Sequence, residues 1–189
     1  MAYFCIKLLN VEQTVAKTDV LGYNIMERND NSIYNEGESK MSDYRFYGWN
    51  STEIQDRNGL HPADYYDILS AIWCAETCAP RLRKNWSTGN KTMGQCSVTA
   101  FLMQDFFGGE VYGILRPGGN YHCFNVVGKC IFDLTSEQFG DEMLDYNNCI
   151  KQSREMHFVK EEKRKRYEYL KTKVMEVLKN GYECACDKL

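Results

Sequence analysis

The sequence has no apolar run long enough to cross a membrane. Its N-terminus, MAYFCIKLLNVEQTV, lacks the basic start, the long apolar core and the small-residue cleavage site of a secretory signal. Neither sign of charge is in large excess, because 23 Lys and Arg residues oppose 26 Asp and Glu residues, for a net charge of −3. We therefore expect a cytoplasmic protein without general affinity for nucleic acid or for membrane surfaces.

Cysteine is abundant, but its spacing lacks the pattern of a metal site. The chain has nine cysteines, and without a secretory signal we expect free thiols instead of a disulfide framework. Cys74 and Cys78 are one helical turn apart, and Cys184 and Cys186 lie near the C-terminus. Neither pair has the C-x-x-C spacing that is common in zinc sites. We predict no bound metal and no other cofactor.

The length and composition indicate one globular domain. With 189 residues, of which 43% are hydrophobic and 13% aromatic, the chain can bury a substantial core. We place this domain at residues 59–189 and an N-terminal extension or small β appendage at residues 1–58. Residues 28–42, RNDNSIYNEGESKMS, are polar and almost devoid of core residues, which predicts a flexible segment within the extension.

The stretch from residue 94 to residue 135 carries the strongest structural signals, beginning with a helix. Residues 97–107 contain no Gly or Pro and are apolar around most of the helical circumference, as is typical of a buried helix. Gly108 and Gly109 follow and are expected to end it. Cys96 therefore lies in or next to the first turn, where free N–H groups and the positive end of the helix dipole favour a thiolate.

Three short strands are predicted after this helix, at residues 110–116, 121–127 and 130–135. Gly128 in the first position of a two-residue loop fits a type II′ hairpin turn, which pairs Phe124 with Asp133. His122 and Asp133 then share one face as diagonal neighbours, with Cα atoms about 7–8 Å apart. We expect this face to pack against the start of the Cys96 helix.

The other predicted elements complete an α+β fold. A helix begins at Pro62, a favourable first helical position, and a charged helix spans residues 160–180 with Gly181 as its cap. A short helical turn is predicted at residues 136–139 and a strand around residues 157–158. The expected architecture is a central buried helix that carries the cysteine and packs on a small antiparallel sheet, with flanking helices.

Cys96, His122 and Asp133 are the residue types of a nucleophile, a base and an orienting acid. An imidazole next to a thiol can take its proton, and a carboxylate on the far ring nitrogen fixes the tautomer. The backbone N–H of Cys96 is a natural oxyanion donor, and Gln95 is a candidate for a second donor. The structural alternatives are a buried cysteine, a hydrogen-bonded sheet histidine and an Asp-x-Thr turn.

A basic, polar loop leads directly into Cys96. It covers residues 81–93, with the sequence RLRKNWSTGNKTM. Such a loop can line a cleft and attract an acidic group, because binding residues are often placed on loops next to a rigid scaffold. A solvated surface anchored by Trp86 is the alternative interpretation.

Three stretches in this part of the chain, GQCSVTAFLMQDFFGGE, HCFN and DLTSEQF, together resemble the YunG-like family of uncharacterised bacterial proteins. That family shows a GQC-x-VTA stretch, a QD-aromatic-x-GGE stretch, an HYWN-type segment and a DLT-x-x-QF segment. The resemblance covers residues 62–140. This chain departs from the pattern at Cys123 and Phe124, where the family has Tyr and Trp, and in a hairpin that is one residue shorter.

The order of a helix with Cys, a strand with His and a strand with Asp also resembles the core of transglutaminase-like and papain-like cysteine enzymes. This resemblance implies a Cys-His-Asp triad that acts on amides or thioesters. We therefore expect a cysteine hydrolase or acyltransferase with a peptide, protein or small-molecule substrate. Two alternatives stay open: a non-catalytic module that binds a peptide or small ligand in the same cleft, and a cysteine-based redox or metal-sensing protein. The sequence does not indicate an oligomeric state.

Overall fold

The computed structural model describes residues 46–186, with the backbone alone for residues 181–186. The flexible segment predicted at residues 28–42 therefore lies outside the described residues, as does most of the predicted extension. The elements are α1 (Pro62–Ile72), the 3₁₀ helix η1 (Pro80–Asn85), α2 (Cys96–Phe107), β1 (Glu110–Leu115), β2 (Tyr121–Val127), β3 (Cys130–Phe132), the 3₁₀ helix η2 (Ser136–Phe139), β4 (Ile150–Lys151), α3 (Arg154–Phe158) and α4 (Glu161–Cys186).

The four strands form one antiparallel sheet in the order β3-β2-β1-β4. Val127 of β2 pairs with Cys130 of β3 across a loop of two residues, Gly128 and Lys129. Gly128 has a φ of 60°, as the first position of a type I′ or II′ turn requires. The predicted two-residue hairpin and its register are therefore confirmed, and the sheet with its helices gives the predicted α+β class.

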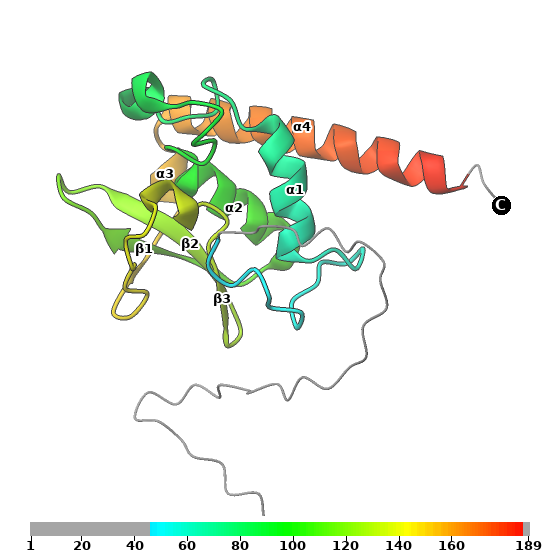
Figure 1. Cartoon of the computed structure of the whole chain (residues 1–189), viewed down its shortest axis with the longest axis horizontal. Coiled ribbons are helices and arrows are strands. Elements are labelled where there is room, and N and C mark those ends of the chain that lie inside the picture. The colour runs from blue at the N-terminus through cyan, green and yellow to red at the C-terminus, as the bar shows by residue number, and fades with distance from the viewer. Residues whose placement is uncertain (1–45, 187–189) are drawn as a thin grey trace, which may run out of the picture. The chain divides into compact units, whose positions relative to one another are not determined.

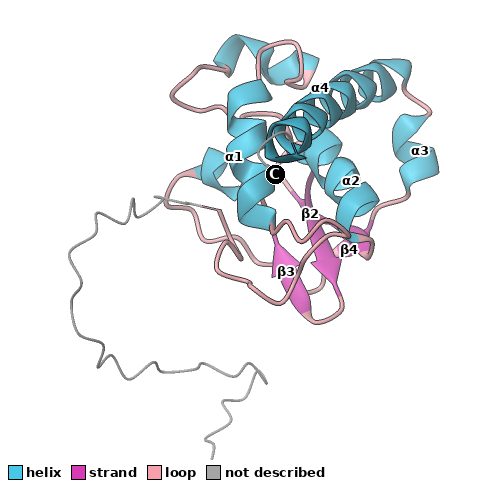
Figure 2. Ribbon diagram, turned by 90° about the vertical axis from the view of Figure 1, so that its right-hand side faces the viewer, coloured by secondary structure: helices cyan, strands magenta, loops and turns pink. Residues whose placement is uncertain are grey.

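Helix α2 lies between the sheet and α4, and α4 also contacts α1 (Figures 1 and 2). Four of its apolar side chains are fully buried: Val98, Phe101, Leu102 and Met103. Burial of an apolar side chain of this size stabilises a fold by about 1.5–3 kcal/mol. The prediction of a buried central helix is thus confirmed, and the first residue of this helix is Cys96.

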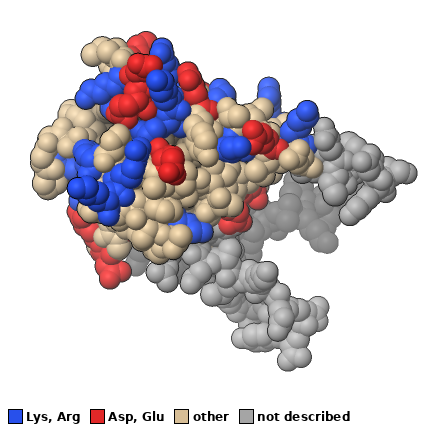
Figure 3. All heavy atoms as spheres, turned by 90° about the horizontal axis from the view of Figure 1, so that it is seen from above, with Lys and Arg blue, Asp and Glu red and all other residues tan. Residues whose placement is uncertain are grey.

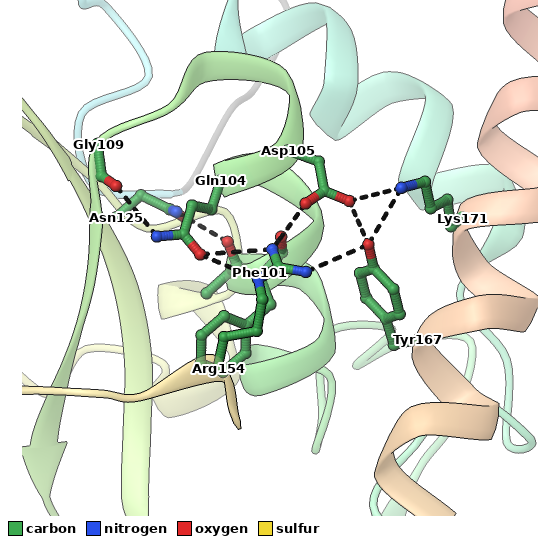
Figure 4. A network of polar contacts seen from close by, with 9 residues as sticks. Phe101, Gln104, Asp105, Gly109, Asn125, Arg154, Tyr167 and Lys171 are labelled. Atoms are coloured by element: carbon green, nitrogen blue, oxygen red, sulfur yellow. Dashed lines mark hydrogen bonds and ion pairs between the residues drawn. The ribbon is translucent and has the colours of Figure 1, made fainter. Parts of the chain in front are cut away.

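A polar network holds the C-terminal half of α2 (Figure 4). The carboxylate of Asp105 accepts hydrogen bonds from Arg154 at 2.7 Å, from Lys171 at 2.8 Å and from the Tyr167 hydroxyl. Because Arg154 begins α3 and the other two donors belong to α4, one carboxylate ties three helices together. On the opposite side, Asn125 of β2 donates to the Ala100 carbonyl oxygen of α2 at 2.8 Å.

Strand β3 is shorter than predicted because Asp133 begins a turn. Its Oδ1 atom accepts hydrogen bonds from the backbone N–H and the hydroxyl of Thr135, both at 3.1 Å. This Asx-type turn bends the chain out of the sheet after Phe132. The backbone N–H of Asp133 donates instead to the Tyr47 carbonyl oxygen at 2.9 Å, in an isolated bridge.

Two predictions near the C-terminus are wrong. The strand expected at residues 157–158 is part of helix α3, which Ser153 caps by accepting a hydrogen bond from the Met156 backbone N–H at 3.1 Å. Helix α4 continues through Gly181 to Cys186 and does not end at Gly181. One Gly in a helix interior costs only about 1 kcal/mol, and no proline follows to stop the helix.

Residues 46–58, which the sequence places in the extension, contribute to the core. Phe46 and Ile54 are buried in it. The Tyr47 backbone N–H donates to the Ser136 hydroxyl at 2.8 Å, next to the Asp133 turn. This segment therefore supports the turn that carries the predicted acid.

The described residues give further information on metals, disulfides and membranes. Among them, no group of three or more His, Cys, Asp or Glu side chains is arranged to hold a metal ion. No helix in residues 46–186 is long and apolar enough to cross a membrane. Six of the cysteines whose side chains the structure describes are free thiols: Cys74, Cys78, Cys96, Cys123, Cys130 and Cys149.

We predict that Gly48→Ala destabilises the protein more than Gly59→Ala. Both glycines have left-handed backbones, with φ values of 81° and 82°, so each substitution costs about 1–2 kcal/mol for the backbone. A Cβ atom at Gly48 would overlap the Ile131 carbonyl oxygen, whereas nothing lies within 4 Å of one at Gly59. Overpacking adds about 1–3 kcal/mol at Gly48. Urea unfolding followed by circular dichroism checks this, and equal losses would contradict the packing of Gly48 on β3.

Candidate active site

Cys96 is the first residue of α2 and is only partly buried. Among the described residues, no side chain caps the start of α2 by a hydrogen bond to its first N–H groups. Cys96 lines one cavity together with His122 and another together with Cys123, and both of these residues act on the pKa of its thiol. The fold thus brings the predicted nucleophile and base together.

The second predicted contact, between His122 and Asp133, is formed in the interior. The Nε2 atom of His122 donates to Asp133 Oδ2 at 2.5 Å, and both side chains are 1% exposed. Nδ1 is the remaining ring nitrogen, and the Gln138 amide nitrogen lies 3.4 Å from it. The arrangement leaves Nδ1 as the nitrogen that can exchange a proton with Cys96.

Each oxygen of the Asp133 carboxylate has further partners. Oδ1 accepts the two hydrogen bonds from Thr135, and Oδ2 accepts one from the Tyr146 hydroxyl at 3.1 Å. Asp133 therefore begins an Asp-x-Thr turn and also contacts His122. Because the carboxylate accepts four hydrogen bonds, from His122, Thr135 and Tyr146, it has little freedom to move away from the imidazole.

The surroundings of the Cys96 thiol favour its ionised form. The pKa of Cys96 lies well below its ordinary value, first because the Cys123 thiol hydrogen-bonds to it. Burial opposes this shift, and the hydrogen bond and positive charge of His122 add to it. The pKa of Cys123 is raised well above its usual range, because its thiol hydrogen-bonds to Cys96 and because it is buried.

The His122 ring is held in its protonated form. Burial acts to lower its pKa, but the charge of Asp133 and its hydrogen bond, together with Cys96, outweigh this and raise the pKa of His122 to about 10. The lowered pKa of the thiol and the raised pKa of the imidazole both favour a thiolate–imidazolium pair.

The face that His122 and Asp133 share is not the one that the body of α2 covers. His122 and Asp133 share a face, but that face is covered by residues after β3, with Phe139 stacked edge-on to His122 at 4.7 Å between ring centroids. Helix α2 packs on the opposite face, where Asn125 contacts it. Cys96 interacts with both His122 and Cys123, which are adjacent on β2. Neighbouring residues of a strand project to opposite faces, so a side chain reaches both only from the end of the strand. The start of α2 therefore lies at one end of β2.

The role predicted for Gln95 requires a correction. Its side chain is fully buried, and its amide nitrogen donates to the Cys74 carbonyl oxygen at 3.0 Å. This contact anchors the residue before α2 in the interior. We therefore assign no oxyanion role to Gln95.

Four contributors were not identified as site residues from the sequence. Gln138 accepts a hydrogen bond from the Gly94 backbone N–H at 3.3 Å and donates to the Thr135 carbonyl oxygen at 2.7 Å, which links the loop before Cys96 to the Asp133 turn. Gln138 belongs to the DLTSEQF stretch, so the motif itself was a signal. The other three are Phe139, in the same stretch, Cys123, which is adjacent to His122, and Tyr146, for which the sequence holds no signal that we can identify.

Two cavities meet at Cys96. One, of about 580 Å³, also contains Cys123, and the other, of about 280 Å³, also contains His122. Arg81, from the predicted basic loop, lines both. A larger cavity of about 740 Å³ beside α4 contains none of the predicted site residues. Cys96 therefore borders two separate cavities.

Known proteins similar to this chain are found by sequence. The model of the YunG protein family matches residues 61–179, a range that includes Cys96, His122 and Asp133. A Bacillus subtilis (strain 168) protein named "Uncharacterized protein YunG" is 34% identical over 92 residues, which are 49% of this chain and 73% of the relative. No solved structure matches the chain. The chain therefore belongs to the YunG family.

Proposed function

We propose that the protein is a cysteine hydrolase or acyltransferase that acts on an amide, peptide or thioester. The observation that carries this proposal is the buried hydrogen bond between His122 and Asp133 beside Cys96, which lines the same cavity as His122 and whose pKa that ring helps to lower. The helix with Cys, the strand with His and the following Asp fit the core of papain-like and transglutaminase-like enzymes. On the basis of this arrangement, we also propose that the fold is of the papain-like or transglutaminase-like type.

The proposed reaction begins with attack of the Cys96 thiolate on the substrate carbonyl carbon. A C–S bond forms, and the carbonyl oxygen becomes an oxyanion that the Cys96 backbone N–H is placed to stabilise. The His122 imidazolium gives its Nδ1 proton to the leaving nitrogen or sulfur, whose bond to the carbonyl carbon breaks. The product of this half-reaction is an acyl group bound to Cys96 as a thioester.

The second half-reaction releases the acyl group. Neutral His122 takes a proton from water, for hydrolysis, or from an acceptor such as an amine, for transfer. The activated acceptor attacks the thioester carbon, and Cys96 leaves as a thiolate. Asp133 stays ionised throughout and stabilises the imidazolium each time it forms.

The buried charges favour catalysis over simple binding. Taking an ion pair out of water costs several kcal/mol per ion, so such a pair is weak support for stability alone. His122 and Asp133 are both 1% exposed, and the thiolate of Cys96 depends on them. A module that only binds a ligand gains nothing from an activated thiolate, whereas a nucleophile requires one.

We predict that Cys96 is the first thiol to react with a limiting amount of iodoacetamide. Its lowered pKa keeps it reactive below the pH at which an ordinary thiol, with a pKa of about 8.5, is mostly protonated. Cys78 and Cys149 serve as internal controls, because burial raises the pKa of each. Mass spectrometry locates the label. Earlier labelling of Cys123, Cys184 or Cys186, or a rate at Cys96 that follows an ordinary thiol titration, would remove the nucleophile assignment.

We predict that Asp133→Asn strongly reduces the alkylation rate of Cys96 near neutral pH. Because the pKa of His122 is raised, protonation of this ring stabilises the folded protein. This contribution to stability is fully present below about pH 6.5 and is lost as the pH rises through about 10. Without the carboxylate charge, the pKa of His122 falls and that of Cys96 rises. We expect a loss of about tenfold or more near pH 7, since each pKa unit changes the ionised fraction tenfold.

Tyr146→Phe is the matched control for this experiment. It removes a hydrogen bond to the same oxygen of Asp133 but leaves the charge in place. We expect a small change in rate for this variant. A folded Asp133→Asn protein with the alkylation profile of the unchanged protein would show that the carboxylate does not set the ionisation of Cys96.

A further inference from the structure

The charged side chains that line the 580 Å³ cavity beside Cys96 are mostly cations. Lys160, Lys163 and Arg166 come from the start of α4 and the residue before it, and Arg81 comes from η1. Glu162 is the one carboxylate that lines the cavity among the described residues. Figure 3 shows Lys and Arg atoms grouped toward the end of the molecule where η1 and the start of α4 lie. This clustering contrasts with the net charge of −3 of the whole chain.

One cation of this cluster is already neutralised. Arg166 Nε donates to Glu162 Oε2 at 3.0 Å, and Arg166 Nη1 donates to the Thr77 carbonyl oxygen at 3.0 Å. Arg166 therefore has a structural role, joining α4 to the segment before η1. The remaining three cations, Arg81, Lys160 and Lys163, form no ion pair with any described carboxylate.

Lys163 is the most confined of the three. Its Nζ atom donates to His157 Nδ1 at 3.2 Å. Burial, and then the positive charge of Lys163, lower the pKa of His157 to about 3, so this partner is a neutral imidazole near neutral pH. The pKa of Lys163 is lowered as well, first by burial and next by the charge of Lys160. An ammonium that is partly removed from water and faces other cations is stabilised when an anion binds.

We propose that this cavity is the subsite for an anionic group, a carboxylate or a phosphate, carried by the substrate that Cys96 attacks; the assignment rests on the proposed function. Lys163 lies at the inner part of the subsite as a point charge. Arg81 is exposed and lines both cavities at Cys96, so its guanidinium can bind an anion with two parallel hydrogen bonds. Lys160 adds a third positive charge at the surface.

Two alkylating agents of similar size test the subsite. Iodoacetate is an anion and iodoacetamide is neutral, and both require the same Cys96 thiolate. The ratio of their rate constants at Cys96 is therefore independent of the pKa of the thiol. We expect Lys163→Gln to lower this ratio about fivefold or more, because a charge at short range in a partly buried site contributes at least that much. Arg81→Gln added to it should lower the ratio further.

Lys173→Gln is the matched control. Lys173 lies on the same helix, pairs with Glu176 at 2.8 Å and does not line the cavity, so its loss should leave the ratio unchanged. Added salt should lower the ratio of the unsubstituted protein, since it screens the cations. Protection of Cys96 from iodoacetamide by malonate or by inorganic phosphate, at equal ionic strength, distinguishes a carboxylate site from a phosphate site.

The outcomes separate the two proposals. If the ratio of the iodoacetate and iodoacetamide rate constants is the same in all variants, with folding verified by circular dichroism, the subsite proposal is overturned. The assignment of Cys96 as the nucleophile is not affected by that result. If Cys96 reacts slowly with both reagents near neutral pH, the proposed function is overturned. If the ratio measured at higher pH still depends on Lys163, the anion subsite is kept in that case. A ratio that falls equally in the Lys163 and Lys173 variants overturns the subsite, because net charge alone would then account for it.

Discussion

The hydrogen bond from His122 to Asp133 is the contact on which the candidate site depends. This bond is 2.5 Å long and completely buried. It depends on the fixed length of the β2–β3 hairpin, and on the turn that directs the Asp133 carboxylate back to the sheet and gives its oxygens further partners. Tyr47 and Tyr146 supply part of this support, from segments far apart in the sequence, and their rings stack at 4.2 Å. The charge of Asp133 raises the pKa of His122, and His122 in turn helps to lower the pKa of Cys96, so Asp133 acts on the thiol through the imidazole.

The scaffold places the thiol by fixing α2 at both ends. At its start, the buried Gln95 and the contact between Gly94 and Gln138 determine where the helix begins. Farther along, Asp105 is held by α3 and α4. The apolar middle of α2 packs against the sheet on one side and α4 on the other. The same α4 brings Lys163 to the cavity, which connects the packing of the central helix with the charge beside Cys96.

Local signals predicted the elements nearest the site. The uninterrupted apolar helix and the Gly128 turn fixed α2 and the β2–β3 register, and the register placed His122 and Asp133 together. Which face of the sheet the body of α2 covers depends on tertiary packing, which strand alternation cannot reveal; it is the face that carries Asn125. Tyr146 and Lys163 reach the site through long-range contacts that no short pattern encodes. Gln95 is next to the nucleophile in sequence, but its direction is set by the distant Cys74 carbonyl oxygen.

The most direct measurement of the central claim is an NMR titration of the imidazole nitrogens, which is favourable because the chain has three histidines. The ion pair requires that His122 stays an imidazolium through neutral pH and loses its proton only near about 10. His157, with a pKa near 3, is the neutral reference in the same spectrum. Replacement of Cys96 by alanine should lower the pKa of His122, because the thiolate contributes to it. A His122 ring that is neutral at about pH 8 in the unsubstituted protein would contradict the account.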